Sequence, residues 1–119
     1  LQKLNKISHP LIAQMIQVHA EQLAEPAKDG IIFLEAALLI EAKWAQLCQS
    51  IWIIIADPEV VIQRLKQRNS FTEEQAKARQ AAQMTNAERL PYADVLIENN
   101  GSVATLHQQL DIALANLLS

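Results

Sequence analysis

Glycine and cysteine are scarce in this chain of 119 residues, which has two glycines and one cysteine. Neither Gly30 nor Gly101 belongs to a G-x-x-x-x-G-K-S/T run, in which backbone N–H groups between a strand and a helix converge on phosphate groups. The sequence therefore contains no phosphate-binding loop. Its single cysteine, Cys48, excludes an internal disulfide framework and a zinc-type cysteine cluster, which favours a reducing, cytoplasmic setting.

Basic residues are also few, with ten Lys and Arg against thirteen Asp and Glu and a net charge of −3. This balance excludes a broad cationic surface for nucleic acid or acidic membranes, so any anion-binding site must be local. The longest apolar run, "IIFLEAALLI" at residues 31–40, is too short to cross a bilayer and contains Glu35. We expect no membrane anchor and a single domain over residues 1–119.

Three short apolar runs predict strands: "IIFLE" (31–35), "IWIIIA" (51–56) and "DVLIEN" (94–99). The second run is apolar on both faces, as in a parallel strand covered by helices. Between the first two, "AALLIEAKWAQLCQ" (36–49) predicts a loop that leads into a helix. Because strands alternate with helical segments, the class is α/β, with a parallel sheet and flanking helices. Three strands are few for a sheet of usual size, about five or six strands, which indicates that part of the sheet is missing.

Capping residues predict four helices, expected over residues 8–23, 57–68 and 72–84 and from Ser102 onward. Ser8 is the expected cap of the first, with Pro10 in the first turn, where a missing N–H has no consequence. Thr72 and Gln75 form a capping-box pattern. The leucines of the last helix recur near one face, so we expect them to pack in the core.

Five segments occur in a definite order: "HPLI" (9–12), "LEAALLIEA" (34–42), "IWIIIADPEVVIQRLKQRN" (51–69), "TEEQAKARQAAQ" (72–83) and "ADVLIENNGS" (93–102). Their succession resembles the dephospho-coenzyme A kinases, a branch of the nucleoside-monophosphate-kinase-like P-loop fold, over nearly the whole chain. That family carries its phosphate-binding loop in an N-terminal portion that has no counterpart here. The chain, which starts at Leu1 without a methionine, is interpreted as the C-terminal portion of such a kinase, inactive alone.

Four positions depart from the family's usual pattern. Glu35 occurs where the family usually has Asp, Ala37 where it has Pro, Ile40 where it has Phe, and Asn69 where it has Asp. Glu35 keeps the carboxylate but extends it by one methylene group, which bears on any water-mediated metal contact at this position.

The resemblance implies that the complete protein transfers the γ-phosphoryl group of ATP, with Mg²⁺, to the ribose 3′-hydroxyl of dephospho-coenzyme A. Such a reaction needs alignment and cationic side chains, and arginine binds phosphate oxygens in a bidentate way. Arg68 and Arg79 would be catalytic lid arginines that close over ATP, in a lid at about residues 64–92. Arg64, one helical turn before Arg68, could share this ATP-binding face. Their spacing alone also fits a solvated helix surface.

The resemblance also implies three residues on the acceptor side, His9, Glu35 and Glu41. Glu35 lies at the C-terminal end of a predicted strand, where open parallel sheets bind ligands. The alternative is a buried carboxylate whose hydrogen bonds are made within the protein. His9 could equally be a surface residue or a cap, and Glu41 an exposed acid at a helix start.

A third group, Asn99, Asn100 and Gly101, would bring backbone and amide groups close to adenine in the family's Asn-x-Gly turn. The alternative is a plain turn, because Asn-Gly tolerates positive φ without a ligand.

Two other functions fit the same residues. Another small-molecule P-loop kinase could share the sheet and lid and phosphorylate a nucleotide. A non-catalytic interaction domain derived from a kinase could instead pair its open sheet edge with a partner, either the missing N-terminal portion or a second copy of the chain.

Overall fold

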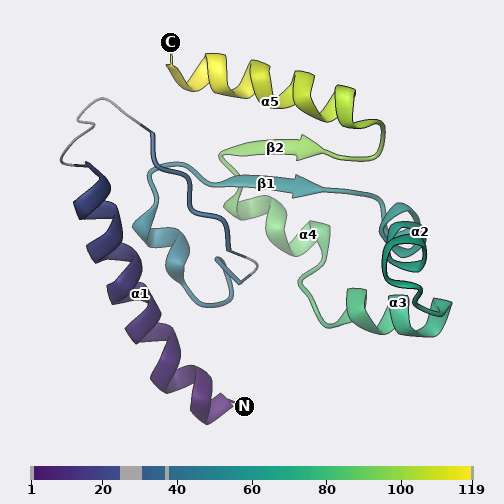
Figure 1. Cartoon of the computed structure of the whole chain (residues 1–119), viewed down its shortest axis with the longest axis horizontal. Coiled ribbons are helices and arrows are strands. Elements are labelled where there is room, and N and C mark those ends of the chain that lie inside the picture. Colours follow the sequence, from purple (N-terminus) through teal and green to yellow (C-terminus); the bar gives the residue numbers. More distant parts are fainter. Residues whose placement is uncertain (1, 25–30, 37, 119) are drawn as a thin grey trace. The chain divides into compact units, whose positions relative to one another are not determined.

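The computed structural model describes residues 2–24, 31–36 and 38–118 (Figure 1). The chain divides into two compact units, Leu1–Gln49 and Ser50–Ser119. The α/β class is confirmed, with a short parallel sheet and flanking helices in the second unit. The expectation of one domain over residues 1–119 stays a prediction.

The sheet has two strands in the described part of the chain, β1 (Trp52–Ile55) and β2 (Val95–Glu98), and they run parallel. Ile54 lies opposite Ile97 in the register. The side chains of Ile53 and Ile97 are 6% and 1% exposed and belong to the core. β-Branched residues suit a pleated, half-buried surface, which is why these runs form strands. The strands predicted within 51–56 and 94–99 are therefore confirmed.

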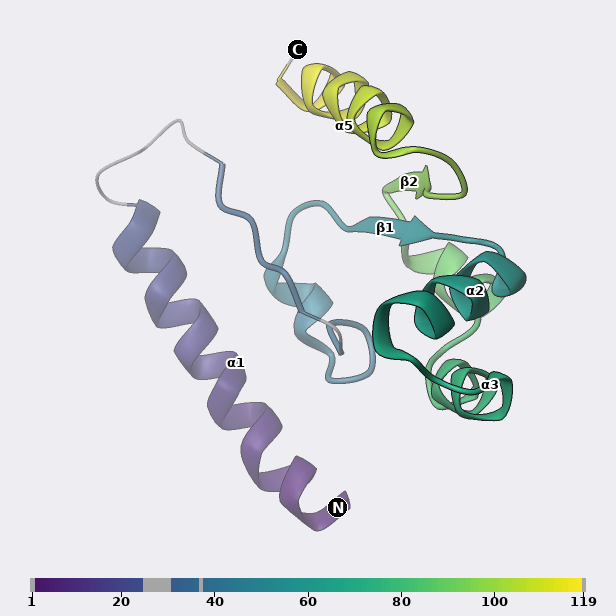
Figure 2. The ribbon, with the colours of Figure 1, turned by 45° about the vertical axis from the view of Figure 1, so that its right-hand side comes forward.

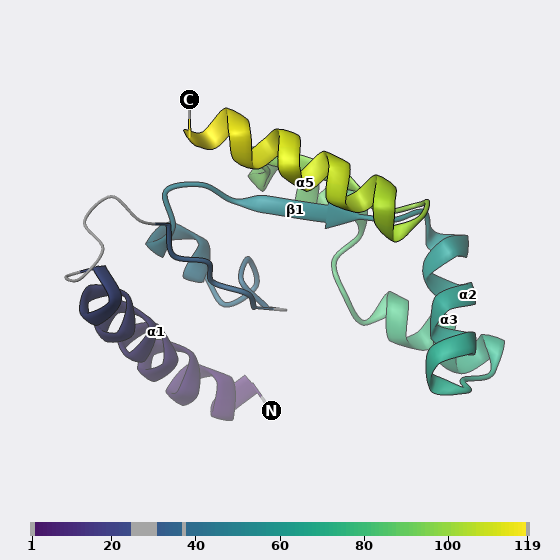
Figure 3. The same cartoon turned by 45° about the horizontal axis from the view of Figure 1, so that its top comes forward.

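Helix α5 (Val103–Leu118) packs on β2 and runs along the strands (Figures 1 and 3). It begins as predicted, because the Ser102 hydroxyl oxygen accepts a hydrogen bond from the Thr105 N–H at 3.1 Å. The leucine stripe is only half-buried, and Leu118 is 66% exposed. The prediction that the whole stripe belongs to the core is wrong, because a sheet of two strands is too narrow to cover it.

Two helices follow β1, α2 (Pro58–Asn69) and α3 (Glu73–Ala81), and they pack against each other (Figure 2). The predicted capping box of α3 is confirmed, with the Thr72 hydroxyl oxygen 3.2 Å from the Gln75 nitrogen and the Gln75 amide oxygen 2.9 Å from the Thr72 nitrogen. Asp57 caps α2 by position, but its side chain makes no capping hydrogen bond. Both predicted helices form, and α3 ends slightly earlier than expected.

The sequence interpretation missed two short helices between α3 and β2, α4 (Asn86–Arg89) and the 3-10 helix η2 (Leu90–Tyr92). A signal was present, because Thr85 and Glu88 form a second capping box. Pro91 lies in the first turn of η2, where its missing N–H has no consequence.

In the first unit, helix α1 (Gln2–Ala24) starts earlier than predicted. The expectation that Ser8 caps it and that Pro10 lies in its first turn is wrong, because Pro10 lies inside the helix. An internal proline removes one backbone hydrogen bond of the helix, but the residues on both sides of it still make their own backbone hydrogen bonds. Neither α1 nor any other described helix has the combination of length and apolarity that crossing a membrane requires.

Residues 31–36 form no strand, so the prediction of a buried strand at 31–35 is wrong in the described structure. Ile31, Ile32 and Phe33 are exposed instead. Composition and β-propensity alone do not decide whether a run becomes a strand, and the strand pairing of the described residues is confined to β1 and β2. Ala37 lies outside the described residues, and the predicted loop and helix after it appear as turns and one 3-10 helix, η1 (Trp44–Leu47).

Removing the Ile97 side chain should test how much the small core contributes to stability. We expect Ile97→Ala to lower the free energy of unfolding by about 3 kcal/mol, because the residue is almost fully buried. Ile112→Ala removes the same atoms from a side chain that is 64% exposed and should lower it by less than about 1 kcal/mol. Urea titration followed by far-UV circular dichroism measures both, and equal losses would contradict the core placement.

Candidate functional site

The candidate site lies where both strands end. The Asn99 N–H donates to the Ile55 carbonyl oxygen at 2.7 Å, which extends the strand pairing by one residue. Just beyond, the Asp57 N–H donates to the Asn100 side-chain oxygen at 2.7 Å. The turn after β2 is therefore attached to the start of α2. Both lie at the carboxyl ends of the two strands, where parallel sheets commonly bind ligands.

Arg64 contacts the same turn from the second turn of α2. Its Nη1 donates to the Asn99 carbonyl oxygen at 2.6 Å, and its Nη2 donates to the Gly101 carbonyl oxygen at 3.4 Å. Within the described ranges no carboxylate lies in ion-pair distance of Arg64, so its positive charge remains uncompensated. The structure thus brings Arg64, predicted to bind ATP beside Arg68, together with Asn99, Asn100 and Gly101, predicted beside adenine.

Two amide side chains that sequence reasoning missed bind the junction between β1 and α2. The Asn86 Nδ2 donates to the Ala56 carbonyl oxygen at 2.9 Å, and the Gln80 Nε2 donates to the Pro58 carbonyl oxygen at 3.3 Å. These contacts span 30 and 22 positions in the sequence, so no local pattern signals them. They attach the second half of the predicted lid segment to the residues that follow β1, at the same end of the sheet as the turn.

The two predicted lid arginines are both exposed. Arg68 Nε donates to the Asn69 side-chain oxygen at 2.9 Å. Asn69 replaces the family's usual Asp, so the partner of Arg68 is neutral and the cationic charge stays available for an anion. Arg79 borders an open hollow of about 420 Å³ with Phe71 and Gln75. Among the hydrogen bonds of the described residues, none joins either arginine to the turn at Asn99.

The predicted acceptor-side residues all lie in the first unit. His9 is half-buried, and its carbonyl oxygen accepts a hydrogen bond from Trp44 Nε1 at 3.2 Å. The two rings are 5.5 Å apart at an interplanar angle of 68°. Glu35 and Glu41 are exposed. The alternative of Glu35 as a buried acid is therefore wrong, and so is its placement at a strand end, because no strand forms there.

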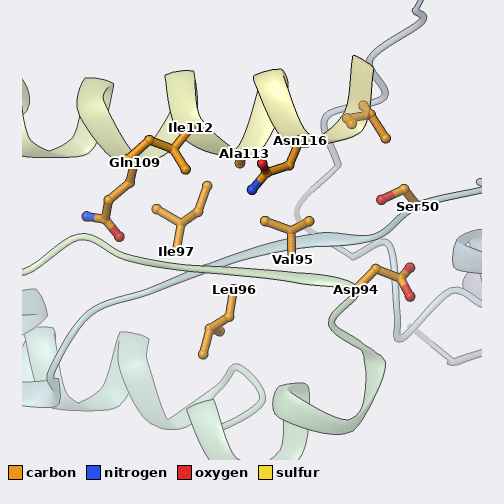
Figure 4. Close-up of a pocket in the computed structure, with 10 residues that line it drawn as sticks. Ser50, Asp94, Val95, Leu96, Ile97, Gln109, Ile112, Ala113 and Asn116 are labelled. Carbon is orange, nitrogen blue, oxygen red and sulfur yellow. The ribbon is translucent and has the colours of Figure 1, made fainter. Parts of the chain in front are cut away.

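A second hollow, of about 530 Å³, lies between β2 and α5 (Figure 4). Val95 and Ile97 point toward the helix, while Leu96 points to the opposite side of the strand. Its polar groups are already bonded: Gln109 Nε2 donates to the Glu98 carbonyl oxygen at 2.7 Å, and Asp94 Oδ2 accepts from the Ile51 N–H at 2.8 Å. This hollow is an apolar gap between helix and sheet, with its polar side chains engaged in holding the fold.

Neither a metal centre nor an activated thiol is found in the described parts of the chain. No three His, Cys, Asp or Glu side chains of residues 2–24, 31–36 and 38–118 come close enough to hold a metal ion. Burial raises the pKa of the Cys48 thiol, so the group is protonated near neutral pH. The chemistry that these residues offer is the binding of anions and of a planar base by arginines and backbone groups.

Comparison with known proteins gives consistent matches. The family model for dephospho-CoA kinase matches residues 1–105. The dephospho-CoA kinase of Dehalococcoides mccartyi is 44% identical over 102 residues, covering 84% of this chain and 50% of the relative. That of Streptococcus mutans is 36% identical over 117 residues, covering 98% of this chain and 58% of the relative.

Two solved structures share the fold. A crystal structure from Thermus thermophilus superposes with a TM-score of 0.77 at 28% identity, covering all of this chain and 60% of that one. Dephospho-CoA kinase from Campylobacter jejuni superposes with a TM-score of 0.67 at 26% identity, covering 98% of this chain and 57% of that one. The chain therefore spans little more than half the length of the proteins it matches.

Proposed function

Because this chain belongs to the dephospho-CoA kinase family, we propose that it is part of an enzyme that transfers the γ-phosphoryl group of ATP to the ribose 3′-hydroxyl of dephospho-CoA. The product is CoA, and the setting is the cytoplasm. The observation that supports this function best is the cluster of Arg64, Asn99, Asn100 and Gly101 at the carboxyl ends of two parallel strands. The turn in this cluster takes the adenine of ATP, with Arg64 beside it.

The lid arginines supply the positive charge. Arg68 and Arg79 are exposed, so both can approach phosphate oxygens when the lid closes. Arginine keeps its charge at every relevant pH, and its planar fork fits two oxygens of a phosphoryl group. In a transfer reaction these side chains stabilise charge on the moving group and need no covalent chemistry of their own.

On the acceptor side, His9, Glu35 and Glu41 orient dephospho-CoA. His9 is the best supported of the three, because Trp44 holds it by a hydrogen bond to its carbonyl oxygen and by an edge contact between the rings. A packed imidazole is a better positioned hydrogen-bonding group than a freely rotating one. Glu35 and Glu41 are exposed carboxylates that can accept hydrogen bonds from hydroxyl groups.

The residues present do not by themselves fit a site for Mg²⁺, since the described ranges contain no group of three ligating side chains. Mg²⁺ usually keeps several waters and binds through one or two carboxylates and the phosphates of its nucleotide. The ion would therefore arrive with ATP.

A substrate panel tests the assignment of the acceptor. The complete enzyme, made by joining the chain to the missing half of a family member, should phosphorylate dephospho-CoA at least about 100-fold faster than adenosine, AMP or CMP, as judged by kcat/KM. The reason is that an acceptor site built for hydrogen bonds rejects analogues that leave its polar groups unpaired. Preference for a nucleotide would instead identify another small-molecule kinase, and inactivity toward every acceptor would favour an interaction domain.

A further inference from the structure

The guanidinium group of Arg64 is occupied by protein backbone. It is half-buried, and its two terminal nitrogens donate to the carbonyl oxygens of Asn99 and Gly101 at 2.6 and 3.4 Å. Arg68, one helical turn later, is exposed and bonds only to its neighbour Asn69 among the described residues. Two arginines on one helix therefore have different surroundings, although the sequence gives them the same appearance.

The turn that Arg64 holds has little other support. It follows the last strand residue, and Asn100 and Gly101 are exposed. Its backbone is paired with the sheet through one hydrogen bond, from the Asn99 N–H to the Ile55 carbonyl oxygen. The Asn100 side chain adds a bond to the Asp57 N–H at the start of α2. Arg64 supplies the second attachment to α2, and its planar guanidinium group links the carbonyl oxygens of Asn99 and Gly101.

We infer that Arg64 is a positioning residue, which holds the turn Asn99–Gly101 against α2 so that the turn is ready to take a nucleobase. Its two terminal nitrogens each donate to a carbonyl oxygen of the turn, so two of the five N–H donors of the guanidinium group anchor the turn to α2. This inference rests on the proposed function and assigns the adenine-side role of Arg64 to the turn that it orders. Preorganisation of this kind improves affinity because less conformational entropy is lost on binding.

The arrangement also leaves one backbone acceptor of the turn unpaired among the described residues. The carbonyl oxygens of Asn99 and Gly101 accept from Arg64, whereas that of Asn100 accepts no hydrogen bond from the described residues. A base with an exocyclic amino group can donate to that free oxygen. The chemical class that fits is therefore a nucleobase with an exocyclic amino group, which includes the adenine of the proposed ATP site.

The test uses the 119-residue chain and its variants Arg64→Lys and Arg64→Gln, with Lys66→Gln as the control for loss of a cation from the same helix. Adenosine and inorganic tripolyphosphate are titrated separately and followed by amide NMR shifts, while hydrogen exchange reports on the turn. Arg64→Lys should weaken adenosine binding about tenfold, and Arg64→Gln more, as expected for loss of charge-assisted hydrogen bonds. Tripolyphosphate affinity should change less than about twofold, and the turn amides should exchange faster in both variants.

Each outcome decides the matter. An equal loss of tripolyphosphate and adenosine affinity would make Arg64 a direct phosphate ligand and overturn the inference, as would unchanged adenosine binding in both variants. If the unchanged chain shows no adenosine shifts at residues 99–102, the turn is not a base site and the inference is wrong. Phosphoryl transfer to dephospho-CoA by the complete enzyme is measured independently, so the proposed function can survive that result. A far-UV spectrum of each variant confirms that it is folded.

Discussion

The 119-residue chain alone should form no CoA from dephospho-CoA and ATP, whereas the chain joined to the unmatched half of a relative should be active. The suitable partner is the half of the Dehalococcoides mccartyi kinase that this chain does not match, placed ahead of Leu1, because that relative is 44% identical in the shared region. The expected ratio of turnover is at least about 10⁴, since both the phosphate cradle and a large part of the charge stabilisation are restored. A coupled assay for ADP release with dephospho-CoA measures it.

The physical reason is the lack of a phosphate-binding loop in this sequence, whose two glycines lie outside any such motif. Backbone N–H groups at a helix start and a lysine normally hold the phosphates in line with the acceptor. The matched control is the same fusion with its phosphate-loop lysine replaced by alanine, which should fall back toward the rate of the chain alone. Steady turnover by the unmodified 119-residue chain would sink the proposal that the loop must come from elsewhere.

Replacing Arg79 by alanine in that fusion should lower kcat by at least about 100-fold, because arginines that stabilise a transferred phosphoryl group are worth about 10³ to 10⁵ in rate. Lys77→Ala is the matched control, since Lys77 lies on the same helix and, among the described residues, forms an exposed ion pair with Glu73 at 4.0 Å. Such pairs contribute little, so the control should keep its activity within about twofold. Initial rates at varied ATP give kcat and KM for both variants.

Arg79→Lys separates charge from geometry. Lysine keeps the positive charge but cannot reproduce the planar two-pronged contact, so the rate should recover only partly. The alternative for Arg79 is an ordinary solvated helix surface. Unchanged kcat and unchanged KM for ATP in Arg79→Ala would return the residue to that alternative and leave Arg68 as the proposed lid arginine.

The positions at which several helices and strands begin are determined by residues that are close in the sequence. The capping box at Thr72 and Gln75, the hydroxyl cap at Ser102 and the apolar runs at Trp52–Ile55 and Val95–Glu98 appear where the sequence predicts them. The sequence predicts these features because the interacting residues are three or four positions apart or belong to one strand. The second capping box, at Thr85 and Glu88, is an equally local signal, although the sequence interpretation does not include it.

Other features depend on partners that are distant in the chain. The apolar run at 31–35 has the composition of a strand, but the strand pairing of the described residues is between β1 and β2, and residues 31–36 are not assigned to a strand. Pro10 has the appearance of a helix start, but the turns before it are helical as well. In both cases the local pattern is compatible with two structures, and packing selects between them.

The three arginines of the predicted lid show the same contrast between local and distant determinants. Composition and spacing place Arg64, Arg68 and Arg79 on helices and establish that each carries a permanent positive charge. Only the folded chain distinguishes them, because the turn that engages Arg64 begins 35 positions away at Asn99. A sequence records which side chains can bind an anion, whereas the approach of distant backbone carbonyl oxygens decides which of them is held in place by the fold.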